Sequence, residues 1–379
     1  MKLKEFARKS IIFLPVFLPF FVIRFSVGPV PTTALEVAIY LVFLLNLGSA
    51  NIKIKWSRQL LFALLFVLSG LLGVWADPDL FSALGLYKAY FIDGFLVYLL
   101  VVNLSDKDKD SLTNLLIFSG VVASAGAIAC YMLGIKADDG RIVDLSLLNS
   151  NYLAMYLAPI FILTLAKIRR QVSVRVYFLI LAALVVALTM YLTQSRGIII
   201  ATIPALIYLM YNLFKQKTGM LKIGFVLFTL LFFIAGYLYY QPDWSDAGRK
   251  ATSSNVRYYI WTTSLEMVRS NPVWGVGLSN YQTYFTNLTQ DRVNYPEFIA
   301  PQALTAHNLY LQLYLTTGIL GIVSFILLIV ASLRGAKNFI YIAACIALLS
   351  YGLVDTPYFR NDLAILFWLL IATMYENRD

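Results

Sequence analysis

Few side chains of this sequence both accept and donate a proton near neutral pH, so the positions of these side chains indicate where acid–base catalysis would take place. His307 is the only histidine among 379 residues. It lies between a long polar stretch and the apolar run that begins at Asn308. Because an imidazole both accepts and donates a proton near pH 7, His307 is the candidate general base. The alternative is that His307 is only an interfacial or helix-capping residue.

Two arginines are candidates for binding phosphate. Arg196 lies in the short polar turn of residues 193–197, where a cation is costly unless it reaches water, forms a pair or binds an anion. Arg257 precedes two tyrosines and Trp261 in the polar stretch. A guanidinium binds two oxygens at once, which suits a phosphate or diphosphate. The alternatives are a snorkelling Arg196 and an Arg257 that anchors its segment at the membrane surface.

Two amide side chains are candidate supporting residues. Gln194 shares the turn of Arg196, and Asn151 lies at the start of another apolar run. Asn151 is expected to donate hydrogen bonds to a sugar, but an asparagine at the start of a helix is also a good cap.

Tyr314 and Asp355 complete the candidate supporting residues. Tyr314 follows His307 at helical spacing, and it is expected to line a cavity or to pack against a neighbouring helix. Asp355 lies in a polar turn between the last two apolar runs. Its carboxylate is expected either to pair with Arg360 in the same turn or to help hold a catalytic cation.

No metal site and no cofactor are expected. Cys130 and Cys345 lie in separate apolar runs, and neither has metal-binding or redox spacing. With a single histidine in the chain, a zinc site of nitrogen and sulfur ligands is close to excluded.

The composition is that of a membrane protein. Hydrophobic residues make up 60% of the chain and charged residues 13%, and the mean hydropathy is +0.75. Apolar runs near the length of a bilayer crossing predict an all-α polytopic fold of about twelve membrane-spanning helices, the first of which is retained. The predicted spans cover residues 11–30, 34–50, 60–76, 83–104, 111–134, 147–166, 176–193, 197–214, 223–240, 308–331, 338–354 and 363–375.

The loop charges predict the orientation. Most of the 30 Lys and Arg residues fall in loops on the side of the two termini, and loops rich in such residues face the cytoplasm. Residues 1–379 are therefore expected to form a single membrane domain with both termini cytoplasmic. The loop of residues 241–306, between the ninth and tenth spans, is expected on the extracytoplasmic side. This distribution explains most of the net charge of +10 without a nucleic-acid partner.

The long loop is expected to contain a helix. Apolar side chains recur there at helical spacing, and they are Val256, Ile260, Trp261, Leu265 and Val268. Asn271 and Pro272 end the pattern. We expect an amphipathic helix that lies along the outer membrane face or caps a cavity.

Three stretches of the sequence form a recognisable set. They are Gln194 to Gly197, Arg257 to Trp261 followed by Asn271 to Asn280, and Ala306 to Gly321. In their order, spacing and placement around one large outer loop, they resemble the O-antigen ligase and polymerase family of bacterial membrane proteins. The resemblance covers residues 150–330.

This resemblance implies a metal-independent, inverting glycosyltransferase in the bacterial inner membrane. Such an enzyme takes a glycan from an undecaprenyl-diphosphate carrier at the outer face. The acceptor is a lipid A-core sugar in ligases, another carrier-linked repeat in polymerases, and protein in some relatives. By resemblance, Arg196 and Arg257 would bind the diphosphate, and His307 would activate the acceptor hydroxyl. A ligase is the first expectation, and a polysaccharide polymerase is the alternative.

Two interpretations from other classes stay open. A transporter or flippase for lipid-linked sugars would place charges in mid-membrane, and Asp93 falls near the middle of its apolar run. A structural scaffold of the envelope would explain the spans, but it gives no reason for an outward Arg196.

Overall fold

The computed structural model describes residues 2–28, 30–137, 139–146, 149–168, 175–215, 224, 253–292, 296 and 299–375. Within these residues the regular secondary structure is helical apart from one two-stranded hairpin. The elements in chain order are α1 (Lys2–Phe13), η1 (Leu14–Val22), β1 (Arg24–Val27), β2 (Val30–Thr33), α2 (Ala34–Gly48), α3 (Arg58–Trp75), α4 (Leu80–Tyr87), η2 (Lys88–Ile92), α5 (Asp93–Val101), α6 (Asp106–Met132), α7 (Ser150–Ile168), α8 (Arg175–Leu192), α9 (Gly197–Lys215), α11 (Ser253–Ser270), α12 (Tyr281–Thr289), η4 (Ala300–Gln302), α13 (Leu309–Gly335), α14 (Phe339–Tyr351) and α15 (Asn361–Met374).

The helices are those of a multi-pass membrane protein. Among the described residues, five helical segments are long and apolar enough to cross a bilayer, namely α3, the continuous segment Leu80–Val101, α6, α7 and α13. Shorter apolar helices are α2, α8, α9, α14 and α15. The all-α membrane fold is therefore confirmed, whereas the count of twelve spans stays a prediction. The predicted span 223–240 and the beginning of the loop 241–306 lie outside the described residues, apart from residue 224.

The first predicted span, residues 11–30, is too long. Its helical part ends at Val22, and the antiparallel strands β1 and β2 follow, with Arg24 opposite Thr33. Two prolines in η1 lack the amide hydrogen that an α-helix uses, and this favours the tighter 3₁₀ turns seen there. No strand is predicted here from the sequence.

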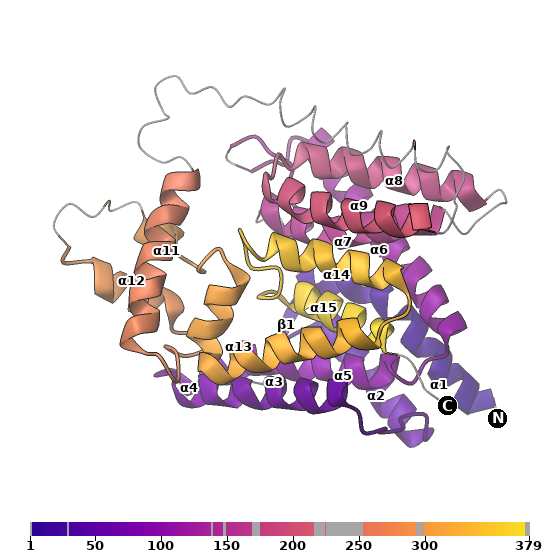
Figure 1. Ribbon diagram of the computed structural model, residues 1–379, viewed down its shortest axis with the longest axis horizontal. Coiled ribbons are helices and arrows are strands. Elements are labelled where there is room, and N and C mark those ends of the chain that lie inside the picture. The colour runs from indigo at the N-terminus through magenta and orange to yellow at the C-terminus, as the bar shows by residue number, and fades with distance from the viewer. Residues whose placement is uncertain are drawn as a thin grey trace.

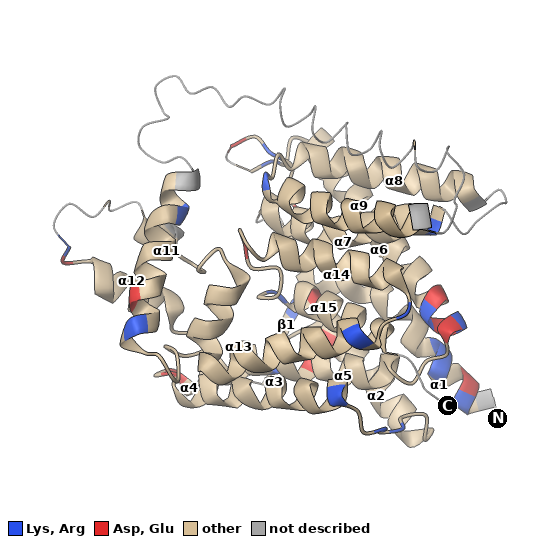
Figure 2. Ribbon diagram, viewed as in Figure 1, with Lys and Arg blue, Asp and Glu red and all other residues tan. Residues whose placement is uncertain are grey.

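The long helices lie side by side in a bundle (Figure 1). Both chain ends lie at one end of the bundle, and α11 and α12 lie at the other. Most Lys, Arg, Asp and Glu residues also lie toward the two ends (Figure 2). Inside the bundle, α7 and α15 are almost completely buried. The ring of Phe66 on α3 lies 6.0 Å from that of Trp368 on α15, within the central aromatic cluster.

The predicted amphipathic helix is confirmed as α11, which ends directly before Asn271 and Pro272. Its buried face includes Val256 and Ile260 and packs with residues of α12 in a small core of its own. Whether α11 lies along a membrane surface stays a prediction.

α13 is interrupted where the chain after α11 inserts into it. Gly318 has φ 66° and ψ −169°, which are not helical angles. The N–H of Val276 donates to the carbonyl of Leu315 (2.7 Å), and the N–H of Ile319 donates to the carbonyl of Val273 (3.1 Å). These bonds satisfy backbone groups that the broken helix leaves without helical partners.

Residues 271–280, which we name the clasp, are also fixed to α3 and to the turn after it. The N–H of Leu278 donates to the carbonyl of Gly73 (3.1 Å). Ser279 donates to the Asp77 carboxylate through its N–H (2.5 Å) and its hydroxyl (2.9 Å). The clasp therefore joins the end of α11 to both α3 and α13.

Candidate active site around His307

His307 lies directly before α13, in a turn that its neighbours hold in place. The Asn308 side chain caps α13 by accepting hydrogen bonds from the N–H groups of Tyr310 and Leu311. The Asn308 amide also donates to the carbonyl of Leu353 (3.0 Å), in the turn after α14. The capping role thus belongs to Asn308, and the imidazole of His307 is left for another contact.

The backbone of His307 is strained. Its φ is +44°, in the left-handed region that a residue with a Cβ atom rarely adopts. Gln194, in the turn of Arg196, has φ +50°. Such conformations cost about 1–3 kcal/mol and often occur at functional sites. Among the described non-glycine residues with positive φ, His307 and Gln194 lie at predicted site positions, whereas Ala50 lies in the loop after α2.

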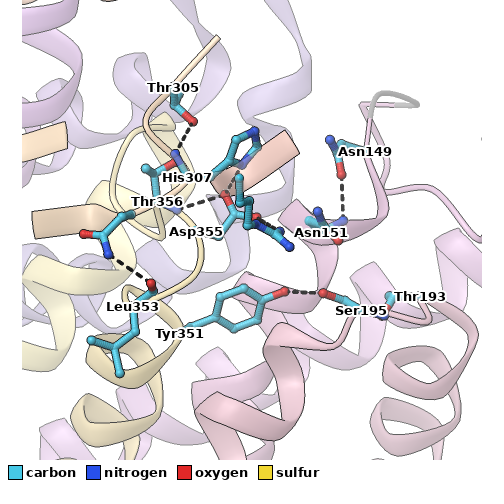
Figure 3. A network of polar contacts seen from close by, with 12 residues as sticks. Asn149, Asn151, Thr193, Ser195, Thr305, His307, Tyr351, Leu353, Asp355 and Thr356 are labelled. Atoms are coloured by element: carbon cyan, nitrogen blue, oxygen red, sulfur yellow. Dashed lines mark hydrogen bonds and ion pairs between the residues drawn. The ribbon is translucent and has the colours of Figure 1, made fainter. Parts of the chain in front are cut away.

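The His307 side chain faces a buried carboxylate (Figure 3). Its Nδ1 lies 3.3 Å from Oδ1 of Asp355. Nη2 of Arg257 lies 3.8 Å from Oδ2 of the same carboxylate. Asp355 is only 4% exposed, and the N–H of Thr356 donates to its Oδ1 (3.0 Å). One buried carboxylate thus connects an imidazole and a guanidinium that are far apart in the sequence.

The expectation that Asp355 pairs with Arg360 is wrong. Arg360 instead pairs with Asp362 at 2.7 Å and with Asp144. The second expectation for Asp355, that it helps to hold a cation of the site, agrees with its contact to Arg257.

α11 positions Arg257 and is held at its middle and at its C-terminal end. Trp261 lies one turn after Arg257, and its Nε1 donates to the carbonyl of His307 (3.3 Å). The C-terminal end of α11 runs into the clasp. The side chain of Arg257 is 23% exposed, so it is only partly covered by protein.

The turn that carries Arg196 is attached to the end of α14. The hydroxyls of Ser195 and Tyr351 are 2.6 Å apart (Figure 3). The carbonyl of Tyr351 in turn accepts a hydrogen bond from the N–H of Asp355 (3.1 Å). The Arg196 side chain is exposed, and it has no hydrogen bond or ion pair with any described residue. The structure thus links its turn to Asp355 but gives its guanidinium no contact with His307.

Arg141 is a further cation close to this turn, and nothing in the sequence predicts it as a site residue. Its Nη1 donates to Oδ1 of Asn151 (3.3 Å) and to the carbonyl of Thr193 (3.4 Å), and its Nε pairs with Asp139 at 2.7 Å. Asn151 is therefore a partner of Arg141, and its N–H donates to the side chain of Asn149 (2.7 Å). No spacing in the sequence distinguishes Arg141 from other loop cations, because only the fold brings its loop to residues 193–197.

From the sequence, Tyr314 is expected either to line a cavity beside His307 or to pack against a neighbouring segment. Its hydroxyl donates to the carbonyl of Pro272 in the clasp (2.5 Å). This contact agrees with the packing alternative and assigns Tyr314 to the attachment of α11 on α13.

The arrangement is suited to removing a proton from a hydroxyl near an anion. With Nδ1 of His307 directed at Asp355, Nε2 is the ring nitrogen that remains for a ligand. Arg257 supplies positive charge at the same carboxylate. Within the described ranges, no three His, Cys, Asp or Glu side chains lie together as a metal site would require.

Two comparisons with known proteins cover part of the chain segment that carries this site. A family model described as O-antigen ligase matches residues 181–326, a range that contains Arg196, Arg257 and His307 but not Asp355. The O-antigen ligase of Salmonella typhimurium (strain LT2) is 23% identical over 269 residues, which are 68% of this chain and 65% of that protein. The match therefore spans slightly less than two thirds of the length of that relative. Residues 181–326 are therefore similar to the O-antigen ligase family, and this similarity covers the candidate base and both candidate phosphate-binding arginines.

Proposed function

We propose that the protein transfers a glycan from an undecaprenyl-diphosphate carrier to the hydroxyl of an acceptor, at the extracytoplasmic face of the bacterial inner membrane. The observation that carries this proposal is the meeting of His307 and Arg257 at the carboxylate of Asp355. An imidazole held by a carboxylate is suited to general-base catalysis, and an adjacent guanidinium is suited to binding an anion. Glycan transfer from a diphosphate carrier uses a base for the acceptor hydroxyl and a cation for the diphosphate, and the two must lie close together.

His307 is the proposed base. A carboxylate only accepts hydrogen bonds, so Nδ1 carries the hydrogen in its bond to Asp355, and the lone pair of the neutral ring is on Nε2. Nε2 takes the proton of the acceptor hydroxyl while the hydroxyl oxygen attacks the anomeric carbon of the donor sugar. The bond from that carbon to the diphosphate oxygen breaks as the new bond forms, which inverts the anomeric centre. The charge of Asp355 then stabilises the imidazolium.

Arg257 and Arg196 are proposed to bind the diphosphate. Negative charge grows on the departing oxygen as its bond breaks, and guanidinium groups stabilise this charge without a proton transfer. Arg257 is carried by a helix that is held one turn further on, at Trp261, and at its C-terminal end, so little ordering is required of its backbone when the donor binds. Arg196 is exposed and has no partner among the described residues, so a ligand meets no competing carboxylate there.

The acceptor distinguishes the two forms of this proposal. The similarity to the O-antigen ligase of Salmonella typhimurium favours a ligase, which would use a sugar of the lipid A-core. A polymerase would use a second carrier-linked repeat. In cells, loss of a ligase leaves polymer on the carrier, whereas loss of a polymerase leaves single repeats.

Transfer measured in lipid nanodiscs tests the proposal. The substrates are an undecaprenyl-diphosphate oligosaccharide and a lipid A-core acceptor, with a second carrier-linked repeat in a parallel reaction. His307→Ala is expected to reduce transfer by about 10²–10⁴-fold, the usual contribution of a general base. Arg257→Ala is expected to reduce it strongly, whereas Arg269→Ala, which removes the same charge from the last turn of α11, should not. Wild-type transfer by His307→Ala in both reactions would refute the proposal.

Asp93 supports one alternative from another class, a transporter of lipid-linked sugars. Its side chain is buried at the start of α5, and Oδ1 accepts a hydrogen bond from the hydroxyl of Tyr40 (2.6 Å). Buried carboxylates in membrane segments are often part of a transport pathway. If the enzyme proposal is correct, Asp93→Asn leaves transfer in nanodiscs unchanged. Flux of a lipid-linked sugar into proteoliposomes without any transfer product would favour the transporter.

A further inference from the structure

A large cavity lies at the end of the bundle opposite α11 and α12. Its volume is about 890 Å³, and it is lined by the first turns of α3, the last turns of α13 and the end of α15, with one side open. These segments meet at the end where the two chain termini lie (Figure 1). The lining includes Lys55, Arg58 and Arg334, and none of the described lining residues is an Asp or a Glu. A cavity with this charge attracts an anion.

Two of these three cations are not neutralised by any residue that the structure describes. Arg58 and Arg334 are exposed, and neither forms an ion pair with any residue in the described ranges. Arg58 is the first residue of α3, where the positive pole of the helix disfavours a cation, and the first turn of α3 has no acidic residue. Arg334 lies in the last turn of α13, where a cation is favoured. The excess positive charge is therefore centred on the start of α3.

The walls of the cavity are apolar on the side of the membrane segments. Phe62 of α3 and Leu327 of α13 both line it, each about one or two turns from the cations. Trp56, at its edge, is 76% exposed, as is typical of tryptophans at a membrane–water interface. A small soluble anion makes no favourable contact with apolar walls. A lipid, in contrast, has both a charged headgroup and hydrocarbon chains that pack against such walls.

The base of the cavity is fixed by hydrogen bonds between three helices. Nε2 of Gln59 donates to the hydroxyl of Ser332 (2.8 Å) and to the carbonyl of Ile371 (2.9 Å). Gln59 and Ser332 both line the cavity. The arginines at its rim therefore belong to helices that already have a fixed position, which lowers the conformational entropy lost when an anion binds.

We propose that this cavity binds the headgroup of an anionic phospholipid from the leaflet on the side of the termini. The lipid phosphate lies among Lys55, Arg58 and Arg334, and the acyl chains lie along α3 and α13. Basic pockets between membrane helices on the cytoplasmic side commonly bind anionic lipids in this way. The lipid would join α3 to α13 at one end of the bundle, as the clasp joins them at the other. The site is independent of glycan transfer.

Native mass spectrometry of the full chain, released from detergent containing phosphatidylglycerol or phosphatidylcholine, tests the proposal. The wild type is expected to retain phosphatidylglycerol and to release phosphatidylcholine. In Arg58→Gln/Arg334→Gln, the affinity for phosphatidylglycerol is expected to be about 30-fold weaker, the effect of two interfacial cations. The matched control is Lys136→Gln/Arg269→Gln, which removes two cations outside the cavity lining and should bind as the wild type does.

The other outcomes are equally informative. Unchanged retention by Arg58→Gln/Arg334→Gln, or equal retention of the two lipids by the wild type, would overturn the proposal. Excess inorganic phosphate that displaces the lipid completely would indicate a site for a soluble anion and would overturn the assignment to a lipid. If the double variant does not fold, Lys55→Gln alone should weaken phosphatidylglycerol binding by about fivefold, the effect of one interfacial cation.

Discussion

Asp355 is the residue on which the proposed site depends. A buried carboxylate is costly unless it has charged or hydrogen-bonding partners, and here His307, Arg257 and the N–H of Thr356 supply them. Its contact with Nδ1 orients the imidazole, while Arg257 remains partly exposed beside it. In the proposed mechanism Asp355 is a positioning residue, because it acts on the substrate through His307.

Replacement of Asp355 by asparagine tests this role. Asp355→Asn keeps the size of the side chain, but its amide is able to donate a hydrogen bond to Nδ1 and thus to favour the unproductive tautomer of His307. We expect a lower kcat with little change in the KM of the donor, and a smaller loss than in His307→Ala. Asp291→Asn, at an exposed loop residue, is the control. A raised KM with an unchanged kcat would show that Asp355 serves substrate binding instead.

The hydroxyl of Tyr351 supports a second prediction at this scale. Tyr351→Phe removes its hydrogen bond with Ser195, which holds the turn of Arg196. Because Arg196 is proposed to bind the donor diphosphate, we expect a higher KM for the donor. Tyr310→Phe, which removes a hydrogen bond to the carbonyl of Leu349 (3.0 Å), should leave this KM unchanged. Equal effects of the two variants would indicate a general loss of stability rather than a role for the turn.

At the scale of elements, the relation of α11 to α13 decides whether the site exists. Arg257 belongs to α11, and His307 precedes α13, so their distance depends on how these two helices meet. The clasp fixes this junction by inserting its backbone where α13 is broken at Gly318. Glycine is required there for two reasons, since its φ is positive and a Cβ atom would clash with the carbonyl of Val273.

Gly318→Ala is therefore expected to weaken both stability and transfer. A non-glycine residue at positive φ costs about 1–2 kcal/mol, and the clash with the clasp adds to this. The expected result is a melting temperature several degrees lower in detergent and a loss of transfer. Gly335→Ala, at the end of the same helix with no atom within 4 Å of the added Cβ, is the control. If Gly318→Ala melts and transfers as Gly335→Ala does, the clasp does not position the site.

At the scale of the whole molecule, a buried ion network joins segments that are distant in the sequence. Arg360 precedes α15 and pairs with Asp362 and with Asp144 of the loop after α6. Its guanidinium also lies 4.5 Å from the ring centre of Phe21 in η1 and 4.5 Å from that of Tyr152 in α7. Burial lowers the pKa of Arg360, but Asp362 and Asp144 outweigh this effect and raise the pKa above its ordinary value. The guanidinium thus remains charged and connects four parts of the fold.

Arg360→Met is expected to destabilise the protein by about 3–5 kcal/mol, because it leaves two buried carboxylates without their cation. Additional replacement of Asp144 and Asp362 by asparagine should recover part of this loss, since the uncompensated charges are then removed. Thermal unfolding in detergent, followed by tryptophan fluorescence, measures both effects. No recovery in the triple variant would mean that Arg360 acts through its packing on Phe21 and Tyr152 rather than through its charge.

The amino-acid sequence alone determined the class of this protein and its candidate polar residues. Hydropathy and helical spacing are local properties, so the apolar helices and α11 are recognisable without a structure. A single histidine, and an arginine in a short turn between apolar runs, are likewise informative by position alone. The hairpin after η1 was not recognisable, because each strand has only four residues and Pro31 lies within the second.

Only the tertiary structure decided which of these residues meet. From the sequence, Asp355 is expected either to pair with Arg360 or to help hold a catalytic cation, and the fold assigns Arg360 to other carboxylates. The contact of Asp355 with Arg257 joins residues nearly a hundred positions apart, and it depends on the clasp and on the break in α13. Such contacts arise from the packing of several helices at once, whereas residue spacing describes one helix at a time.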